Sequence, residues 1–157
     1  MEGIKKLNQV HKILDFHVTN NPDNVSVLVD SESYTNSDIF SKVLSLVGLL
    51  KENKVTSGDR IAYLAKNSSE FIELMYASSI LGLVMVPINF RLAYEEVKFI
   101  IQDSGSKIII FGEEFKELVE KLNADKTDLH LSFGISELRN LLKSKSPGAF
   151  DVSLSVN

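Results

Sequence analysis

The chain has 157 residues, of which 44% are hydrophobic and 24% charged, and its formal net charge is −4. This length fits one domain, and the composition is ordinary for a globular protein. The net negative charge argues against a nucleic-acid partner, which a basic stripe would indicate. The absence of cysteine excludes disulfides, thiolate catalysis and cysteine–zinc sites.

No run of eighteen apolar residues occurs in the chain, so no membrane span is expected. The first twelve residues carry Glu and Lys among their apolar residues and lack the uninterrupted apolar core of a secretory signal. We therefore expect a soluble, cytoplasmic protein.

The N-terminal part of the chain predicts a helix followed by a β-hairpin. Residues 8–19 have helical spacing, and Asn20-Asn21-Pro22 should end that helix. Residues 25–29 and 33–35 predict two short strands on either side of a turn.

The next helix is predicted over residues 37–53. Thr35 is its expected N-cap, and Asp38, three residues on, completes a capping box. One face of this helix is apolar, with residues at the spacing of a buried stripe. These residues are Ile39, Val43, Leu46, Val47 and Leu50.

Three apolar runs follow, at residues 60–65, 83–88 and 107–111. They do not alternate with polar residues, and strands that are covered on both faces of a parallel sheet have this pattern. Helical spacing lies between and after them, at residues 68–81, 93–103 and 113–123. We expect Asn67 to cap the first of these helices, Gly82 to end it and Gly105 to end the second.

This alternation of strands and helices predicts an α/β fold: a mostly parallel sheet of βαβ units with helices on both faces. Residues 1–143 should form one α/β unit. The pattern weakens after residue 123, where only a short helix at 136–143 is expected. Residues 144–157 contain Pro147 and Gly148 and are interpreted as a linker or disordered tail.

Most residue patterns that carry chemistry are missing. The two closest of the eight glycines, Gly105 and Gly112, are seven residues apart, so no clustered glycine loop can hold a phosphate. His11, His17 and His130 are not spaced as metal ligands, and surface positions on helices explain the first two. The acidic pairs 95–96 and 113–114 fall in the first turn of predicted helices, which favours negative charge.

Asn89 and Arg91 directly follow the apolar run that ends near Pro87. Ligands bind beyond the carboxyl ends of strands in open α/β sheets, so these two residues could belong to a site. A structural alternative remains open, in which Arg91 pairs with a carboxylate and Asn89 caps a turn.

Several patterns match one family when they are taken in order along residues 33–115. Ser33-Tyr34-Thr35 precedes a helix, SGDRIAYLAKNSSEF spans 57–71, and ASSILGLVMVPINFRL spans 77–92. EEVKFIIQDSG and KIIIF then follow. This ordered set resembles the N-terminal region of acyl-CoA synthetases, within the adenylate-forming superfamily.

The resemblance implies an enzyme that activates a carboxylic acid with ATP to an acyl-adenylate and transfers the acyl group to CoA. The complete family enzyme uses ATP, Mg and CoA, but its Ser/Thr/Gly-rich ATP loop does not occur here. The resemblance therefore implies an inactive scaffold segment with no catalytic residue of its own, in which residues 1–143 form one N-terminal subdomain of a larger fold. Asn89, Arg91 and Lys116 are candidate contacts on the CoA side. The family often has Thr-Pro where this chain has Ala93-Tyr94, which predicts a less sharp helix start beside Arg91.

Two other readings remain open. The chain could be a free-standing α/β ligand-binding domain, since fold alone does not decide function, or an assembly module that associates with another chain. A segment of a larger enzyme should expose an apolar face, or cover that face by forming a homo-oligomer.

Overall fold

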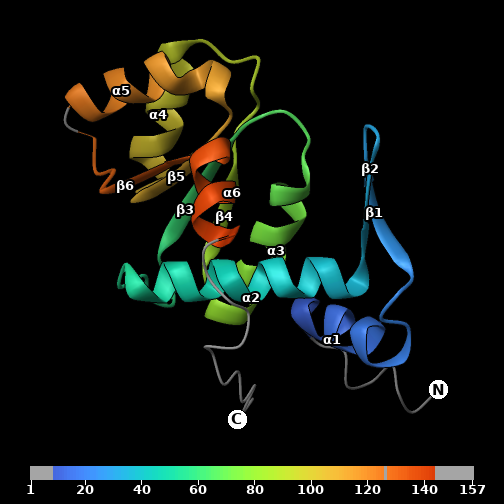
Figure 1. Cartoon of the computed structure of the whole chain (residues 1–157). Coiled ribbons are helices and arrows are strands. Elements are labelled where there is room, and N and C mark those ends of the chain that lie inside the picture. Colours follow the sequence, from blue (N-terminus) through green and yellow to red (C-terminus); the bar gives the residue numbers. More distant parts are fainter. Residues whose placement is uncertain (1–8, 126, 144–157) are drawn as a thin grey trace.

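A four-stranded parallel sheet lies at the centre of the computed structural model, which describes residues 9–125 and 127–143 (Figure 1). In space the strands follow the order β4-β3-β5-β6. Their bounds are Arg60–Leu64 for β3, Val84–Pro87 for β4, Ile108–Phe111 for β5 and Leu131–Gly134 for β6. The prediction of a mostly parallel α/β sheet is therefore confirmed.

Helices cover both faces of this sheet, because successive side chains of a strand point to opposite faces. Ile61 and Tyr63 of β3 join a core with helices α2 (Asn36–Glu52), α3 (Ser69–Leu81) and α6 (Ile135–Lys143). Ala62 and Leu64 join a second core with α4 (Tyr94–Ser104) and α5 (Lys116–Ala124). Figure 1 shows α4 and α5 together on one side of the strands. The prediction of helices on both faces is confirmed.

The N-terminal elements pack on the side of the sheet that carries α2. Helix α1 (Val10–Asn20) lies against α2 and α3. Strands β1 (Val25–Val29) and β2 (Glu32–Thr35) form the predicted antiparallel hairpin, a two-stranded sheet separate from the central one. In Figure 1 this hairpin stands at the end of α2 that is farther from β5 and β6.

Helix α2 begins as the sequence predicts. Its N-cap Thr35 accepts a hydrogen bond from the Asp38 backbone N–H (3.1 Å), and the Asp38 carboxylate accepts one from the Thr35 N–H (2.8 Å). The predicted stripe from Ile39 to Leu50 is buried throughout. This burial fixes α2 to the sheet through apolar packing and not through its own helix propensity.

Strand β6 was not predicted. It has only four residues, Leu131–Gly134, and a serine and a glycine interrupt its apolar character. These four residues form a strand because Ile108–Phe111 of β5 pairs with them in parallel register. Phe133 is buried in the core beneath α2.

The prediction that the run at 83–88 is buried on both faces holds only in part for β4: Met85 packs against one core and Val86 against the other, but Val84 and Pro87 are exposed. This strand is at the edge of the sheet, with β3 as its neighbour in the described part of the chain. Its Val84 side chain is 47% exposed, whereas β5 is buried along its whole length. Apolar composition alone did not distinguish an edge strand from a central one.

Three helix starts differ from the predictions. The N-cap of α3 is Ser68 and not Asn67, and the Ser68 hydroxyl lies 2.8 Å from the Tyr63 hydroxyl instead of capping the helix. A 3-10 turn, η2 (Glu113–Phe115), precedes α5, so that α-helix starts at Lys116. Helix α4 lacks a hydroxyl at its N-cap, but the Glu96 carboxylate accepts a hydrogen bond from the Ala93 N–H (2.8 Å).

Gly82 ends α3 as predicted, and two features of its position require glycine. Its φ is +68°, in the left-handed region that other L-residues adopt only at a cost. A Cβ atom built at this position would lie 2.5 Å from the Ser57 hydroxyl oxygen. The chain thus turns from α3 into β4 at a point where the backbone of the 57–58 loop approaches closely.

Within residues 9–125 and 127–143, none of the helices is both long and apolar enough to span a membrane. Some large apolar side chains of the described residues are nevertheless exposed. They are Val10, Ile13 and Phe16 of α1, Val25 and Leu28 of β1, Val84 of β4 and Phe99 of α4. The predicted linker at 144–157 lies outside the described residues.

Candidate functional site

The carboxyl ends of the four parallel strands define one edge of the sheet, which we call the carboxyl edge. From β3 the chain passes to β4 on one side, and it later returns to β5 on the other side of β3. Such a reversal of strand order is the topological switch point at which open α/β sheets bind ligands. The loops that follow Leu64 and Phe111 lie at this point.

Two of the three predicted contact residues follow β4 at the carboxyl edge. The Asn89 side-chain oxygen accepts a hydrogen bond from the Arg91 backbone N–H (3.0 Å), so Asn89 caps the turn as the structural alternative expected. The guanidinium carbon of Arg91 lies 5.5 Å from the centroid of the Phe90 ring, within the range of a cation–π contact. Arg91 is exposed, and the described residues include no carboxylate that forms an ion pair with it.

The third predicted residue, Lys116, is the first residue of α5, after β5. It is exposed at the same edge as Arg91. Since β3 lies between β4 and β5, two strand spacings of about 4.8 Å separate the loops that carry these residues. The fold therefore places the predicted residues along one edge without bringing them into contact with one another.

Sequence reasoning missed Lys66, which lies on the loop after β3, the strand between β4 and β5. It follows β3, and its ammonium nitrogen lies 3.7 Å from a carboxylate oxygen of Glu114 after β5. The Lys66 side chain is 71% exposed, so this ion pair contributes little stability. Its position directly after the apolar run at 60–65 was the available signal, the same one that identified Asn89.

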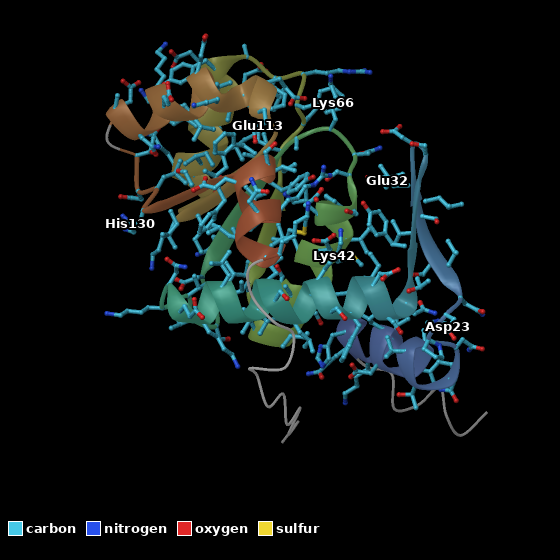
Figure 2. All side chains as sticks on the ribbon, in the orientation of Figure 1. Asp23, Glu32, Lys42, Lys66, Glu113 and His130 are labelled. Atoms are coloured by element: carbon cyan, nitrogen blue, oxygen red, sulfur yellow. The ribbon has the colours of Figure 1, made fainter. Side chains whose placement is uncertain are left out.

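Glu113 lies at the carboxyl edge and supports α6. One of its carboxylate oxygens accepts a hydrogen bond from the Ser136 backbone N–H (2.9 Å) in the first turn of that helix. Negative charge is favourable there because of the helix dipole. The sequence assigned Glu113 to the dipole of its own helix, whereas it caps a different one. Figure 2 shows Glu113 and Lys66 at one end of the sheet and His130 at the other.

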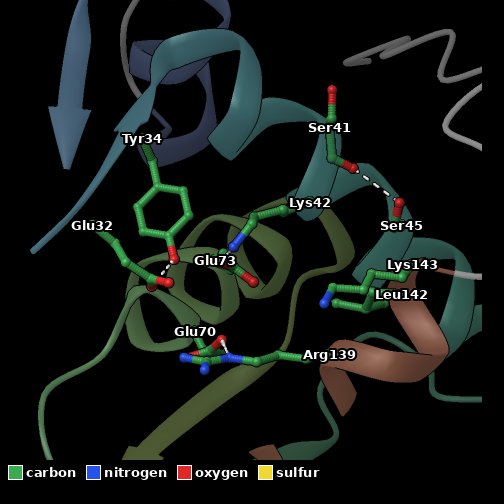
Figure 3. A pocket seen from close by; sticks show the side chains of 10 residues that line it. All are labelled: Glu32, Tyr34, Ser41, Lys42, Ser45, Glu70, Glu73, Arg139, Leu142 and Lys143. Atoms are coloured by element: carbon green, nitrogen blue, oxygen red, sulfur yellow. Dashed lines mark hydrogen bonds and ion pairs between the residues drawn. The ribbon is translucent and has the colours of Figure 1, made fainter. Parts of the chain in front are cut away.

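A cavity of about 470 Å³ lies apart from the carboxyl edge, between α2, α3, α6 and the hairpin (Figure 3). We call it the Tyr34–Arg139 cavity. Its lining residues come from β2, α2, α3 and α6, of which only β2 and α2 adjoin in the sequence. They are Glu32, Tyr34, Ser41, Lys42, Ser45, Glu70, Glu73, Arg139, Leu142 and Lys143.

Two ion pairs with buried carboxylates form one wall of this cavity. The Arg139 Nε and Nη2 atoms donate to the two oxygens of Glu70, at 2.6 and 3.2 Å. Lys42 Nζ lies 3.2 Å from a Glu73 oxygen and 4.1 Å from the centroid of the Tyr34 ring. The carboxylates of Glu70 and Glu73 are 1% and 2% exposed, so almost all of their charge is compensated by protein groups.

The two buried carboxylates differ in their pKa shifts. Burial opposes ionisation of Glu70, but the hydrogen bonds from Arg139 and Ser68 outweigh it and lower the pKa of Glu70. Burial raises the pKa of Glu73, and the nearby Lys42 offsets that effect only in part. A bidentate guanidinium stabilises a buried carboxylate better than a single ammonium group does.

The histidines divide between the surface and the interior. His17 and His130 are exposed, and His17 lies on α1 as predicted. The prediction that His11 is on the surface is wrong: it is 4% exposed, and its Nδ1 lies 3.0 Å from the Ser79 hydroxyl of α3. It is buried because α1 packs its inner face on α3, which the sequence pattern of α1 did not reveal.

Neither a metal-binding cluster for Mg nor a glycine-rich loop for the phosphates of ATP occurs among the described residues. No three His, Cys, Asp or Glu residues among them converge as a metal site would require. The eight glycines of the chain are too far apart to form a phosphate loop. No step that uses either group is therefore assigned to these residues.

The fold and the carboxyl edge together define a parallel α/β domain with a switch point for ligands. The chain belongs to the AMP-binding enzyme family, whose model matches residues 14–150. It is also similar to the structure of the N-terminal domain of FACL13 from Mycobacterium tuberculosis, with a TM-score of 0.82 and 29% identity. That match covers 92% of this chain and 38% of the FACL13 chain.

Similar curated proteins are ligases of carboxylic acids. The chain is 32% identical over 121 residues to the fatty acid–[acyl-carrier-protein] ligase ScoC of Streptomyces coeruleorubidus, covering 77% of this chain and 23% of ScoC. It is 45% identical over 82 residues to the long-chain-fatty-acid–CoA ligase FadD13 of Mycobacterium tuberculosis, covering 52% of this chain and 15% of FadD13. The chain thus spans less than a quarter of the length of these relatives.

Proposed function

We propose that this chain is the N-terminal scaffold part of an acyl-CoA synthetase of the fatty-acid–CoA ligase type. The complete enzyme activates a carboxylic acid with ATP to an acyl-adenylate and transfers the acyl group to CoA. The observation that carries this proposal is the likeness to FadD13, which is 45% identical over 82 residues. The described elements support a scaffold role, since they form a sheet with two cores and a carboxyl edge.

The chain by itself is proposed to be inactive, and ATP and Mg are proposed to bind elsewhere in the complete enzyme. Its scattered glycines cannot hold a triphosphate, which supports this division of roles. The cytoplasmic location remains a prediction from the sequence, as do the subdomain bounds of 1–143.

For the CoA side we propose contacts with Asn89, Arg91 and Lys116. Arg91 and Lys116 are exposed cations on one edge, and Lys66 lies between their loops. Phosphate groups such as those of CoA are bound by exposed Arg and Lys side chains. Because Asn89 holds the turn before Arg91, it is proposed to act mainly by orienting that residue.

A chimera tests the proposed function directly. Residues 9–143 of this chain replace the matching segment of FadD13, and acid-dependent pyrophosphate release and CoA-thioester formation are measured with a panel of fatty acids. We expect activity from the chimera and none from this chain alone. A chimera that is folded by circular dichroism but forms no acyl-adenylate would contradict the proposal.

The CoA contacts are tested in the same chimera. Arg91→Ala and Lys116→Ala should each raise the KM for CoA roughly three- to tenfold, which corresponds to about 1 kcal/mol, and leave the KM for ATP unchanged. Arg60→Ala is the matched control, since Arg60 is exposed at the amino end of β3. Equal effects of Arg60→Ala and Arg91→Ala would argue against a CoA surface at the carboxyl edge.

A different acyl acceptor is the main alternative within the family. The relative ScoC is named as a ligase for an acyl-carrier protein, so the chimera is assayed with holo-acyl-carrier protein as well as CoA. The readings as a free-standing ligand-binding domain or an assembly module predict no activity in any chimera. They also predict a defined partner or ligand for the chain alone.

A further inference from the structure

The Tyr34–Arg139 cavity shares no lining residue with the carboxyl edge. We propose that this cavity is a second ligand site, which binds a small organic carboxylate. Its volume of about 470 Å³ lies within the range of small-molecule sites, which is about 300–1,000 Å³. The proposal goes beyond the acid-activating function and does not depend on it.

Three cationic side chains border the cavity, and Figure 3 shows them extending toward it from two helices. Arg139 uses Nε and Nη2 for Glu70, which leaves Nη1 outside that pair, and its side chain is 46% exposed. Lys143 is exposed at the C-terminal end of α6. Guanidinium and ammonium groups that line one cavity can each donate hydrogen bonds to a carboxylate oxygen.

Two of the three negative groups of the cavity are less accessible than the positive ones. The Glu70 and Glu73 carboxylates are nearly fully buried, whereas the Lys42 side chain is 32% exposed. Glu32 is the exposed carboxylate of the lining, and it already accepts a hydrogen bond from the Tyr34 hydroxyl (2.5 Å).

The apolar parts of the lining select an organic acid over an inorganic anion. Leu142 and the Tyr34 ring border the same space as the cations (Figure 3). A ligand with a carboxylate at one end and a short aliphatic or aromatic body at the other can pair with the cations and pack against the apolar side chains. Inorganic phosphate can pair only with the cations.

The test uses two-dimensional ¹H–¹⁵N NMR titrations of the 157-residue chain with hexanoate and benzoate. Hexanamide and benzamide are the matched neutral probes, and inorganic phosphate is the control anion without an apolar group. We expect saturable shifts at residues of α2, α3 and α6 with the two acids, and at least tenfold weaker binding of the amides and phosphate. Equal binding of acid and amide, preference for phosphate, or shifts confined to the carboxyl edge would each overturn the proposal.

Two variants with opposite expected effects make the test specific. Lys143→Gln should weaken binding of benzoate roughly three- to tenfold, and Glu32→Gln should strengthen it roughly two- to threefold by removing the exposed negative charge. Lys51→Gln, an exposed residue at the end of α2, is the matched control and should have no effect. Unchanged affinity in both Lys143→Gln and Glu32→Gln would also overturn the proposal. The FadD13 chimera contains these residues unsubstituted, but its assay measures acyl activation and transfer and not binding at this cavity, so either proposal can fail alone.

Discussion

Replacing Arg139 with alanine should destabilise the fold in a manner that depends on pH. Arg139 is the bidentate partner of Glu70, whose carboxylate is 1% exposed on α3. Removing one partner of a buried ion pair costs about 3–5 kcal/mol. Because the Arg139 side chain is 46% exposed, water reaches the pair in part. We therefore expect a loss of about 2–3 kcal/mol in the free energy of unfolding at pH 7.

The sign of the pH effect follows from the pKa of Glu70. Its folded-state pKa lies below the ordinary value of 4.5. The ionised group therefore contributes stability above the unfolded pKa, and this stability is lost as the pH falls through the lower folded value. In Arg139→Ala the burial of Glu70 remains but the guanidinium is lost, so the pKa of Glu70 should be higher than in wild type. The stability gap between wild type and variant should then narrow as the pH falls from 7 to 4.

Urea unfolding followed by far-ultraviolet circular dichroism measures this gap, since the chain has no tryptophan for fluorescence. Arg60→Ala controls for loss of a surface arginine and should change stability by less than about 0.5 kcal/mol. In a Glu70→Gln background, Arg139→Ala should cost less than in wild type and should show no such pH dependence. A gap of equal size at pH 7 and pH 4, or a cost below about 0.5 kcal/mol, would refute the reasoning.

Other substitutions test the local structure by the same unfolding measurement. Gly82→Ala should cost about 1–2 kcal/mol from its left-handed backbone plus the clash with Ser57, and adding Ser57→Ala should recover only the part due to the clash. Full recovery in the double variant would show that backbone strain is absent. Thr35→Ala should cost about 1 kcal/mol by removing the capping box of α2, whereas Thr35→Ser should be nearly neutral. Equal effects of the two would rule out the hydroxyl as the cap. Ile109→Ala should cost about 2–5 kcal/mol and Ile109→Val about 0.5–1.5 kcal/mol, because the side chain is fully buried in the core beneath α4 and α5. Costs near zero would contradict the described packing.

Long periodic segments were predicted well, because a helix or strand that is buried on one face has a repeat of apolar residues that can be found in the sequence. The stripe of α2 from Ile39 to Leu50 and its cap at Thr35 are local features, and the structure has both. The apolar run of β5 indicated a central strand correctly. Strand β6 could not be predicted in this way, because four residues that include a serine and a glycine become a strand only through pairing with β5.

The candidate sites were predictable only in part. The carboxyl edge could be located, because Asn89 and Arg91 directly follow an apolar run and parallel strands end at the same side. Lys66 carried the same signal after β3 and was overlooked. The Tyr34–Arg139 cavity could not be predicted, because the two residues of each ion pair are far apart in the sequence. The separation is 31 positions for Lys42 and Glu73 and 69 positions for Glu70 and Arg139.

The sequence by itself determined the α/β class, the order of most strands and helices along the chain, and the capped start of α2. These features depend on periodicity and on side-chain to backbone bonds within a few residues. Only the tertiary structure decided which strand is at the edge, that His11 is buried, and how Glu70 and Glu73 are neutralised. These features arise from packing and ion pairing between segments that are distant in the sequence. No short stretch of sequence contains both of the residues that make such a contact.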